Sequence, residues 1–174
     1  MENKGCYNYA AKENNYQFLE IPYITNYFSM FIILPYERFG LSKMLKSFNV
    51  NELLDMMFAT NSIEGNVVIP KFTAESSFEL SQILRHLKIN DAFDASNADF
   101  SGVTTDAKIH ISRILQKVSV KVSEEGTKAA VATVLEDIFI SNDDDTFQFT
   151  ADHPFLYILA DKNKNIYFVG TFYN

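Results

Sequence analysis

The sequence predicts a single mixed α+β domain. Residues 30–34 form a continuous apolar run that Pro35 closes, which is typical of a strand buried on both faces. Residues 117–122 alternate between valines and polar side chains, as a half-buried strand does. Short helical patterns lie between such strands, without a linker or an internal repeat. At 174 residues and 47% hydrophobic composition, the chain is long enough to bury one core.

The first half of the chain is expected to contain strands and two short helices after a polar, tyrosine-containing segment that ends at Asn15. The strands are predicted at residues 18–22, 28–34 and 67–69, and the helices at residues 42–48 and 51–59. Asn51 is the predicted N-cap of the second helix, with Glu52 near its positive end. Pro70 ends or bends the third strand.

The second half is predicted to begin with the clearest helix of the chain. Ser76 and Glu79 have capping-box spacing, and the apolar residues that follow lie on one helix face: Leu80, Ile83, Leu84 and Leu87. A loop over residues 90–103 and a long strand over 109–122 are expected next. Residues 155–159 and 166–169 form a predicted hairpin around a polar turn.

Composition excludes several classes of protein. A net charge of −7 disfavours a nucleic-acid partner, which would require clustered Lys and Arg. The sequence has no apolar run of the ~18 residues that a membrane span needs, and its first residues do not form a signal peptide. Cys6 is the only cysteine and no Asn-x-Ser/Thr sequon occurs, so both features favour a reducing compartment.

A search for catalytic groups predicts that the protein is not an enzyme. There is no Gly-x-Ser-x-Gly elbow, and His86, His110 and His153 are dispersed without metal-ligand spacing. The acidic run at 143–145 lacks the glycine and distal glutamate of a calcium loop, and is interpreted as a solvated surface. No metal and no cofactor are predicted.

Residues 124–134 admit two interpretations from their pattern alone. Two carboxylates and Gly126 interrupt the preceding strand, and a run of small residues follows. This pattern fits a strand, a hinge and a segment small enough to enter between neighbours. The same stretch also fits an amphipathic helix capped by Thr127, with apolar residues at i, i+3, i+4 and i+7: Val131, Val134, Leu135 and Ile138. Spacing leaves both alternatives open.

Resemblance to a known family favours the hinge. The sequence Glu124-Glu125-Gly126-Thr127-x-Ala129-Ala130-Val131-Ala132-Thr133 resembles the reactive-loop hinge of serpins. Residues 149–156, Phe-Thr-Ala-Asp-His-Pro-Phe-Leu, resemble the segment after that loop, especially in the ovalbumin-like branch. Further segments resemble the family in the same order along the chain: residues 18–23, 29–35, 68–72, 97–102 and 166–170.

The resemblance implies a partial serpin fold. It would contain most of the second sheet, two outer strands of the main sheet, short helices and an exposed reactive loop. Residues 1–174 would be the C-terminal portion of a single serpin domain whose N-terminal half is absent, because Met1 aligns with an internal position of the family.

The implied function is inhibition of a serine-type endopeptidase by the serpin suicide-substrate mechanism, with a reactive loop at about residues 127–145. Family spacing places the candidate scissile bond at Ile140–Ser141, with Phe139 and Asp137 as alternatives. The target is expected to be a chymotrypsin-like or elastase-like protease rather than a trypsin-like one. The family default is the extracellular space, and a cytoplasmic location is the alternative.

Two features define the competing hypothesis. Gln116 stands where the family commonly has a histidine that controls opening of the main sheet, and the chain lacks the N-terminal half. These features favour a non-inhibitory serpin-like binding or structural fragment. The truncated chain alone is not expected to be a competent inhibitor.

Overall fold

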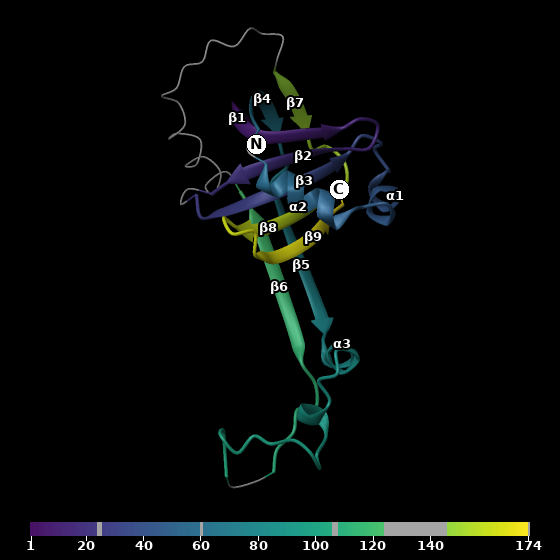
Figure 1. The fold of residues 1–174 in the computed structure, drawn as a ribbon, viewed down its shortest axis with the longest axis vertical. Coiled ribbons are helices and arrows are strands. Elements are labelled where there is room, and N and C mark those ends of the chain that lie inside the picture. The colour runs from purple at the N-terminus through teal and green to yellow at the C-terminus, as the bar shows by residue number, and fades with distance from the viewer. Residues whose placement is uncertain (24–25, 60, 106–107, 124–145, 174) are drawn as a thin grey trace. The chain divides into compact units, whose positions relative to one another are not determined.

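The computed structural model describes residues 1–23, 26–59, 61–105, 108–123 and 146–173. It divides into two compact units, residues 1–72 with 121–174 and residues 73–120. Figure 1 labels the elements. In chain order the strands are β1 (Glu2–Lys12), β2 (Tyr16–Pro22), β3 (Phe28–Pro35), β4 (Ser62–Val68), β5 (Phe72–Glu79), β6 (Leu115–Val122), β7 (Phe147–Thr150), β8 (Phe155–Asp161) and β9 (Ile166–Phe172). The helices are α1 (Leu41–Lys46), α2 (Val50–Phe58) and α3 (Ser81–His86), and η1 (Asp91–Phe93) is a 3-10 turn.

The first unit is built on a seven-stranded sheet in the order β7-β4-β1-β2-β3-β8-β9. Every pairing is antiparallel except that of β4 with β7, which is parallel. Strand β3 lies between β2 and β8, and its residues from Met30 to Leu34 are buried. The predicted strand buried on both faces and the predicted hairpin of β8 and β9 are therefore confirmed.

One face of this sheet carries the main core. Helices α1 and α2 contribute Leu41, Met44, Leu53 and Met57 to a cluster with side chains from β2, β3 and β8. Burial of these apolar side chains is the main term that holds the helices on the sheet. Both helices were predicted, and their bounds differ by one or two residues.

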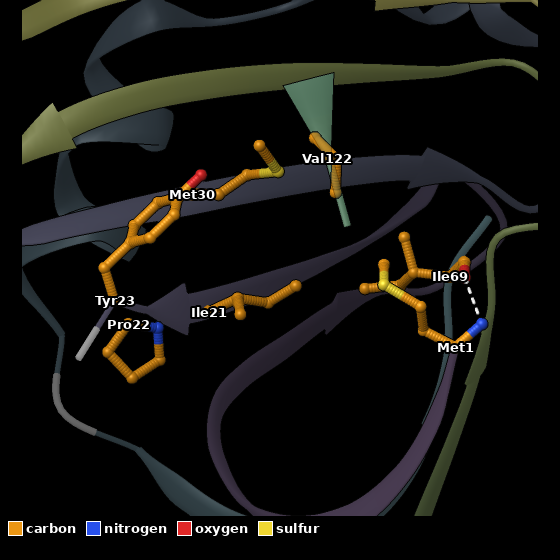
Figure 2. Close-up of a pocket in the computed structure, with 7 residues that line it drawn as sticks. All are labelled: Met1, Ile21, Pro22, Tyr23, Met30, Ile69 and Val122. Atoms are coloured by element: carbon orange, nitrogen blue, oxygen red, sulfur yellow. Dashed lines mark hydrogen bonds between the residues drawn. The ribbon is translucent and has the colours of Figure 1, made fainter. Parts of the chain in front are cut away.

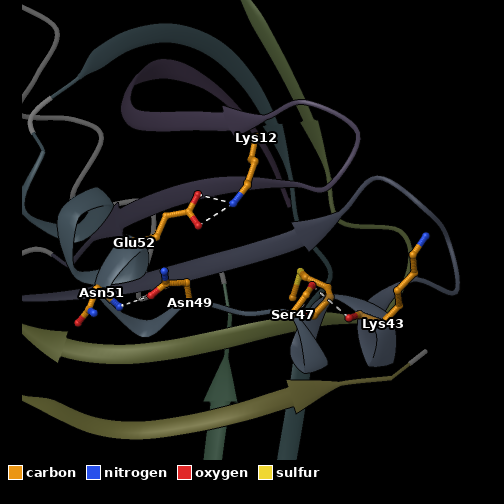
Figure 3. A network of polar contacts seen from close by, with 7 residues as sticks. Lys12, Lys43, Ser47, Asn49, Asn51 and Glu52 are labelled. Atoms are coloured by element: carbon orange, nitrogen blue, oxygen red, sulfur yellow. Dashed lines mark hydrogen bonds and ion pairs between the residues drawn. The ribbon is translucent and has the colours of Figure 1, made fainter.

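The N-cap of α2 differs from the prediction. Asn49, not Asn51, caps the helix: its side chain accepts a hydrogen bond of 3.0 Å from the backbone N–H of Asn51 (Figure 3). Glu52 does lie in the first turn, where its carboxylate also binds the ammonium group of Lys12 at 2.6 Å. This ion pair joins α2 to the end of β1.

Strand β1 was not predicted, because its sequence lacks apolar alternation. Only Tyr7 is buried in it. Its backbone instead pairs on two sides, with β4 along residues 2–8 and with β2 along residues 9–12. Ladder hydrogen bonds to two neighbours hold this strand where side-chain pattern gives no signal.

The second unit corrects two further predictions. Residues 76–79 belong to β5, which pairs with β6, and the helix begins only at Ser81. Ser81 is buried, and its hydroxyl accepts a hydrogen bond of 3.0 Å from Ile114 N–H. The strand predicted over 109–122 begins at Leu115, because the preceding segment bonds elsewhere, as from Ile111 N–H to the Ala92 carbonyl.

Candidate functional site

The predicted hinge and scissile-bond residues lie at 124–141, outside the described residues. The structure describes the strand that precedes this segment in the chain and the strand that follows it. Strand β6 ends at Val122, and β7 begins at Phe147. The candidate site is therefore described through these two flanking strands, β6 and β7.

The N-terminal flank is the alternating strand that the sequence predicts. Val120 and Val122 are buried and Val118 is half-buried, whereas Lys117, Ser119 and Lys121 are exposed. Within the described part of the chain, β6 has one hydrogen-bonded neighbour, β5. Its second edge thus has no partner among those residues. Gln116 is exposed on this strand.

An apolar hollow lies at the end of β6 (Figure 2). Val122 points into it, together with side chains from β2, β3 and the residue after β4: Ile21, Met30 and Ile69. The N-terminal amine of Met1 donates a 2.9 Å hydrogen bond to the Ile69 carbonyl at its rim. The hollow measures about 20 Å³, which is room for a single water molecule. The hollow is therefore too small for a ligand, and the apolar side chains that line it hold Val122 in place.

The C-terminal flank is anchored by an aromatic clamp, which we define as Tyr7, Tyr9, Gly65 and Phe147. The Phe147 ring, 8% exposed, stacks on Tyr9 at 3.9 Å between centroids and meets Tyr7 edge-on at 6.3 Å. Phe147 also pairs in register with Gly65 of β4. A side chain at Gly65 would overlap the Phe147 ring, so the glycine creates the space for it.

Burial also changes the acid–base behaviour of the clamp. It raises the pKa of Tyr9 to about 12, with a further contribution from the nearby Tyr36 hydroxyl. Tyr9 therefore stays neutral at any physiological pH. The clamp is an apolar and structural feature, without a charged or nucleophilic group.

A polar junction follows β7. The backbone N–H of Ala151 donates to the Val68 carbonyl at 2.8 Å, which extends the pairing with β4. His153 Nε2 lies 2.6 Å from the Pro35 carbonyl, and its Nδ1 lies 2.7 Å from Asp152 Oδ1. The hydrogen bond from His153 lowers the pKa of the Asp152 carboxyl, and Arg38 at 3.3 Å adds to the effect. The junction ties the segment between β7 and β8 to the end of β3, and His153 has a structural role in it.

No catalytic constellation is formed by the residues that the structure describes. Among them, no three His, Cys, Asp or Glu side chains lie close enough to hold a metal ion. No helix in the described ranges is long and apolar enough to cross a membrane. Cys6 is exposed on β1.

Sequence reasoning missed the clamp. Tyr7 and Tyr9 stand two residues apart, as on one face of a strand, and this spacing was the available signal. It carries little weight without knowledge that residues 2–12 form a strand. The contribution of Gly65 depends on register, which sequence alone does not give.

Together, the seven-stranded sheet, the strand pair β5–β6 and the short helices define a mixed α+β fold. A family model described as "Serpin (serine protease inhibitor)" matches residues 1–174. The chain belongs to the serpin family.

Individual relatives agree with this assignment. Mouse Serpin B11 is 39% identical over 175 residues, covering 99% of this chain and 45% of the relative. Human Serpin B8 is 35% identical over 166 residues, covering 93% of this chain and 44% of the relative. The solved structure of native protease nexin-1 with heparin superposes with a TM-score of 0.74 at 30% identity, covering 99% of this chain and 46% of that one. The chain thus spans less than half of the length of these relatives.

Proposed function

We propose that the chain carries the protease-trapping part of a serine protease inhibitor, with residues of about 127–145 as its reactive loop. One observation supports this most: the serpin-like hinge sequence follows directly on β6, a strand with one edge unpartnered among the described residues. The aromatic clamp then fixes the point where the chain returns at Phe147. In a family described as serine protease inhibitors, such a segment would be attacked by the protease as a substrate and would not itself catalyse a reaction.

The proposed mechanism is the one that the serpin resemblance of the hinge implies. The protease serine attacks the scissile carbonyl, the peptide bond breaks, and the new amino terminus leaves while the loop stays esterified to the enzyme. The freed loop then adds as a strand along the β6 edge, which gains ladder hydrogen bonds and carries the protease away. Small side chains such as Ala129 and Ala132 lower the steric barrier to this step. Gly126 supplies the backbone freedom at the turn.

Specificity is proposed from the residues around the scissile bond. Cleavage at Ile140–Ser141 would suit an elastase-like pocket, whereas cleavage after Phe139 would suit a chymotrypsin-like one. Asp137 lies earlier in the loop and would point to an acid-preferring protease. No Lys or Arg occurs between Lys128 and Lys162, so a trypsin-like target is disfavoured.

The chain of 174 residues is proposed to be cleaved without trapping the protease. An inserted strand needs a neighbour on each side, and the described residues offer β6 alone. The N-terminal half of a serpin domain would supply the second neighbour. A non-inhibitory binding or structural role is the second candidate, and the family departure at Gln116 favours it.

Mapping the first cleavage tests the loop assignment. The chain is incubated briefly with chymotrypsin or with elastase, and the fragments are weighed by mass spectrometry. We expect the first cut between Asp137 and Ser141. An amphipathic helix packed through Val131, Val134 and Ile138 would protect this stretch, so early cleavage elsewhere with residues 124–145 intact would refute the proposal.

A further inference from the structure

Each ring nitrogen of His153 faces a hydrogen-bond acceptor. Nδ1 lies 2.7 Å from Asp152 Oδ1, and Nε2 lies 2.6 Å from the backbone carbonyl oxygen of Pro35. A carbonyl oxygen and a carboxylate oxygen accept hydrogen bonds and have no proton to donate. A neutral imidazole has one N–H and satisfies only one of these contacts, whereas the imidazolium cation has two and satisfies both. The geometry therefore requires a proton on each ring nitrogen.

The carboxyl group of Asp152 does not supply one of these protons. Its side chain is 55% exposed, and the hydrogen bond from His153 lowers its pKa. The guanidinium of Arg38, whose Nη1 lies 3.3 Å from Asp152 Oδ2, lowers that pKa further. Asp152 is therefore a carboxylate near neutral pH. Both protons at this junction belong to His153.

Arg38, Asp152 and His153 form a row of alternating charges. The Asp152 carboxylate lies in the middle and binds one cation at each oxygen. Within the described part of the chain, no other charged side chain forms a hydrogen bond or an ion pair with these three residues. The His153 side chain is 11% exposed, whereas that of Arg38 is 62% exposed. The contacts of His153 are thus better shielded from water than the outer ion pair, which strengthens them.

This row joins two parts of the fold that are far apart in the sequence. Pro35 is the last residue of β3, and His153 stands between β7 and β8. Strand β7 has four residues and, in the described ranges, one hydrogen-bonded neighbour, β4. The Ala151 N–H adds one bond of 2.8 Å to the Val68 carbonyl. Because so few ladder bonds hold β7, the bond from His153 to Pro35 is a large share of what fixes the connection from β7 to β8.

We propose that His153 is a pH-sensitive latch. As an imidazolium it ties the connection between β7 and β8 to the end of β3, and loss of one proton leaves one of its two acceptors without a donor. Both acceptors stabilise the charged ring, so the latch is closed at low pH and opens as pH rises through the titration of His153. Its consequence is that pH sets how firmly β7 is held. The inference rests on these contacts and not on the proposed inhibition.

The ring protons of His153 test the first step on the unaltered chain. With isotope-labelled histidine, nuclear magnetic resonance detects a ring N–H proton where a hydrogen bond slows its exchange with water. We expect two ring N–H signals from His153 at about pH 6, and loss of one as the pH is raised to about 9, beyond the usual titration range of histidine. Fewer than two signals at about pH 6, or two signals that persist at about pH 9, would overturn the proposal.

Amide exchange of Ala151 tests the second step, because its N–H bonds to Val68 next to the latch. The rates are corrected for the intrinsic effect of pH on exchange. His153→Arg keeps a charged donor at every pH used, and His153→Gln is uncharged throughout. His86→Gln is the matched control, since His86 is an exposed histidine on α3.

We expect Ala151 in the unaltered chain and in His86→Gln to exchange about tenfold faster at about pH 9 than at about pH 6, as for the loss of one charge-assisted hydrogen bond. His153→Arg should exchange slowly at both pH values, and His153→Gln should exchange fast at both. A corrected rate that does not change with pH in the unaltered chain would contradict the latch. So would a pH effect that both His153 variants retain in full. Neither readout involves a protease, so the outcome is independent of the proposed function.

Discussion

Phe147 is the residue whose removal should most disturb the return of the loop segment to the fold. Its ring is 8% exposed and is held between Tyr9 and the bare backbone of Gly65. Phe→Ala changes in cores cost about 3–5 kcal/mol. Because β7 is a four-residue strand at the sheet edge, which relaxes readily, we expect about 3 kcal/mol, the lower end of that range.

Hydrogen exchange of the β7 amides measures this locally, whether or not the whole chain unfolds cooperatively. About 3 kcal/mol corresponds to about a hundredfold faster exchange if β7 opens as a unit. Gly65→Ala should also release β7, at a cost of about 1–3 kcal/mol, because the new methyl group displaces the ring. Gly102→Ala is the control, since a methyl group there meets no atom within 4 Å.

The double variant decides whether the clamp acts as a unit. Once Phe147 is alanine, Gly65→Ala has no ring to displace and should cost almost nothing. The two effects should therefore fall short of additivity by about 1 kcal/mol or more. Additive effects, or a change of less than about threefold in β7 exchange for Phe147→Ala, would refute the reasoning.

Three further predictions concern separate features. Tyr9 should titrate near pH 12 by ultraviolet absorbance, and the stability it contributes should be full below pH 10 and lost as pH rises towards 12. Tyr9→Phe should remove this part of the loss but not the part from Tyr16, whose pKa burial also raises to about 12, and an unchanged profile would contradict it. Asn49→Ala should destabilise α2 by about 1 kcal/mol, with helix content read by circular dichroism, whereas Asn51→Ala should have little effect. Gly170→Ala should destabilise the β8–β9 pair by about 1–3 kcal/mol, measured by β9 amide exchange, because a methyl group there would overlap the Tyr157 ring.

The sequence was informative where side-chain pattern and burial coincide. The run from Met30 to Leu34 predicted the strand buried on both faces, and the alternating valines predicted the face that β6 buries. Glu52 was placed correctly in the first turn of α2. These elements can be recognised in the sequence because their apolar side chains are also the ones that pack in the core.

The side-chain pattern failed to predict elements whose structure depends on backbone pairing or on residues far away in the sequence. β1 is held by ladders to two neighbours, and its polar sequence gives no period. Residues 76–79 have capping-box spacing but form a strand with β6, because pairing overrides local propensity. The aromatic clamp joins Tyr9, Gly65 and Phe147 through register alone, which cannot be read from one sequence. The hinge and scissile-bond predictions lie outside the described residues and remain predictions.

Protease trapping by the loop between β6 and β7 is the central claim, and a denaturing gel tests it most directly. A fusion that places the unmatched part of mouse Serpin B11 before this chain is incubated with chymotrypsin and with elastase, beside the 174-residue chain alone. The fusion should give a covalent band that survives detergent, and Thr127→Arg in it should give cleavage without that band, because insertion would bury an unpaired charge. The chain alone should only be cleaved. Absence of the band from the fusion with both proteases, or its presence with the chain alone, would contradict the account.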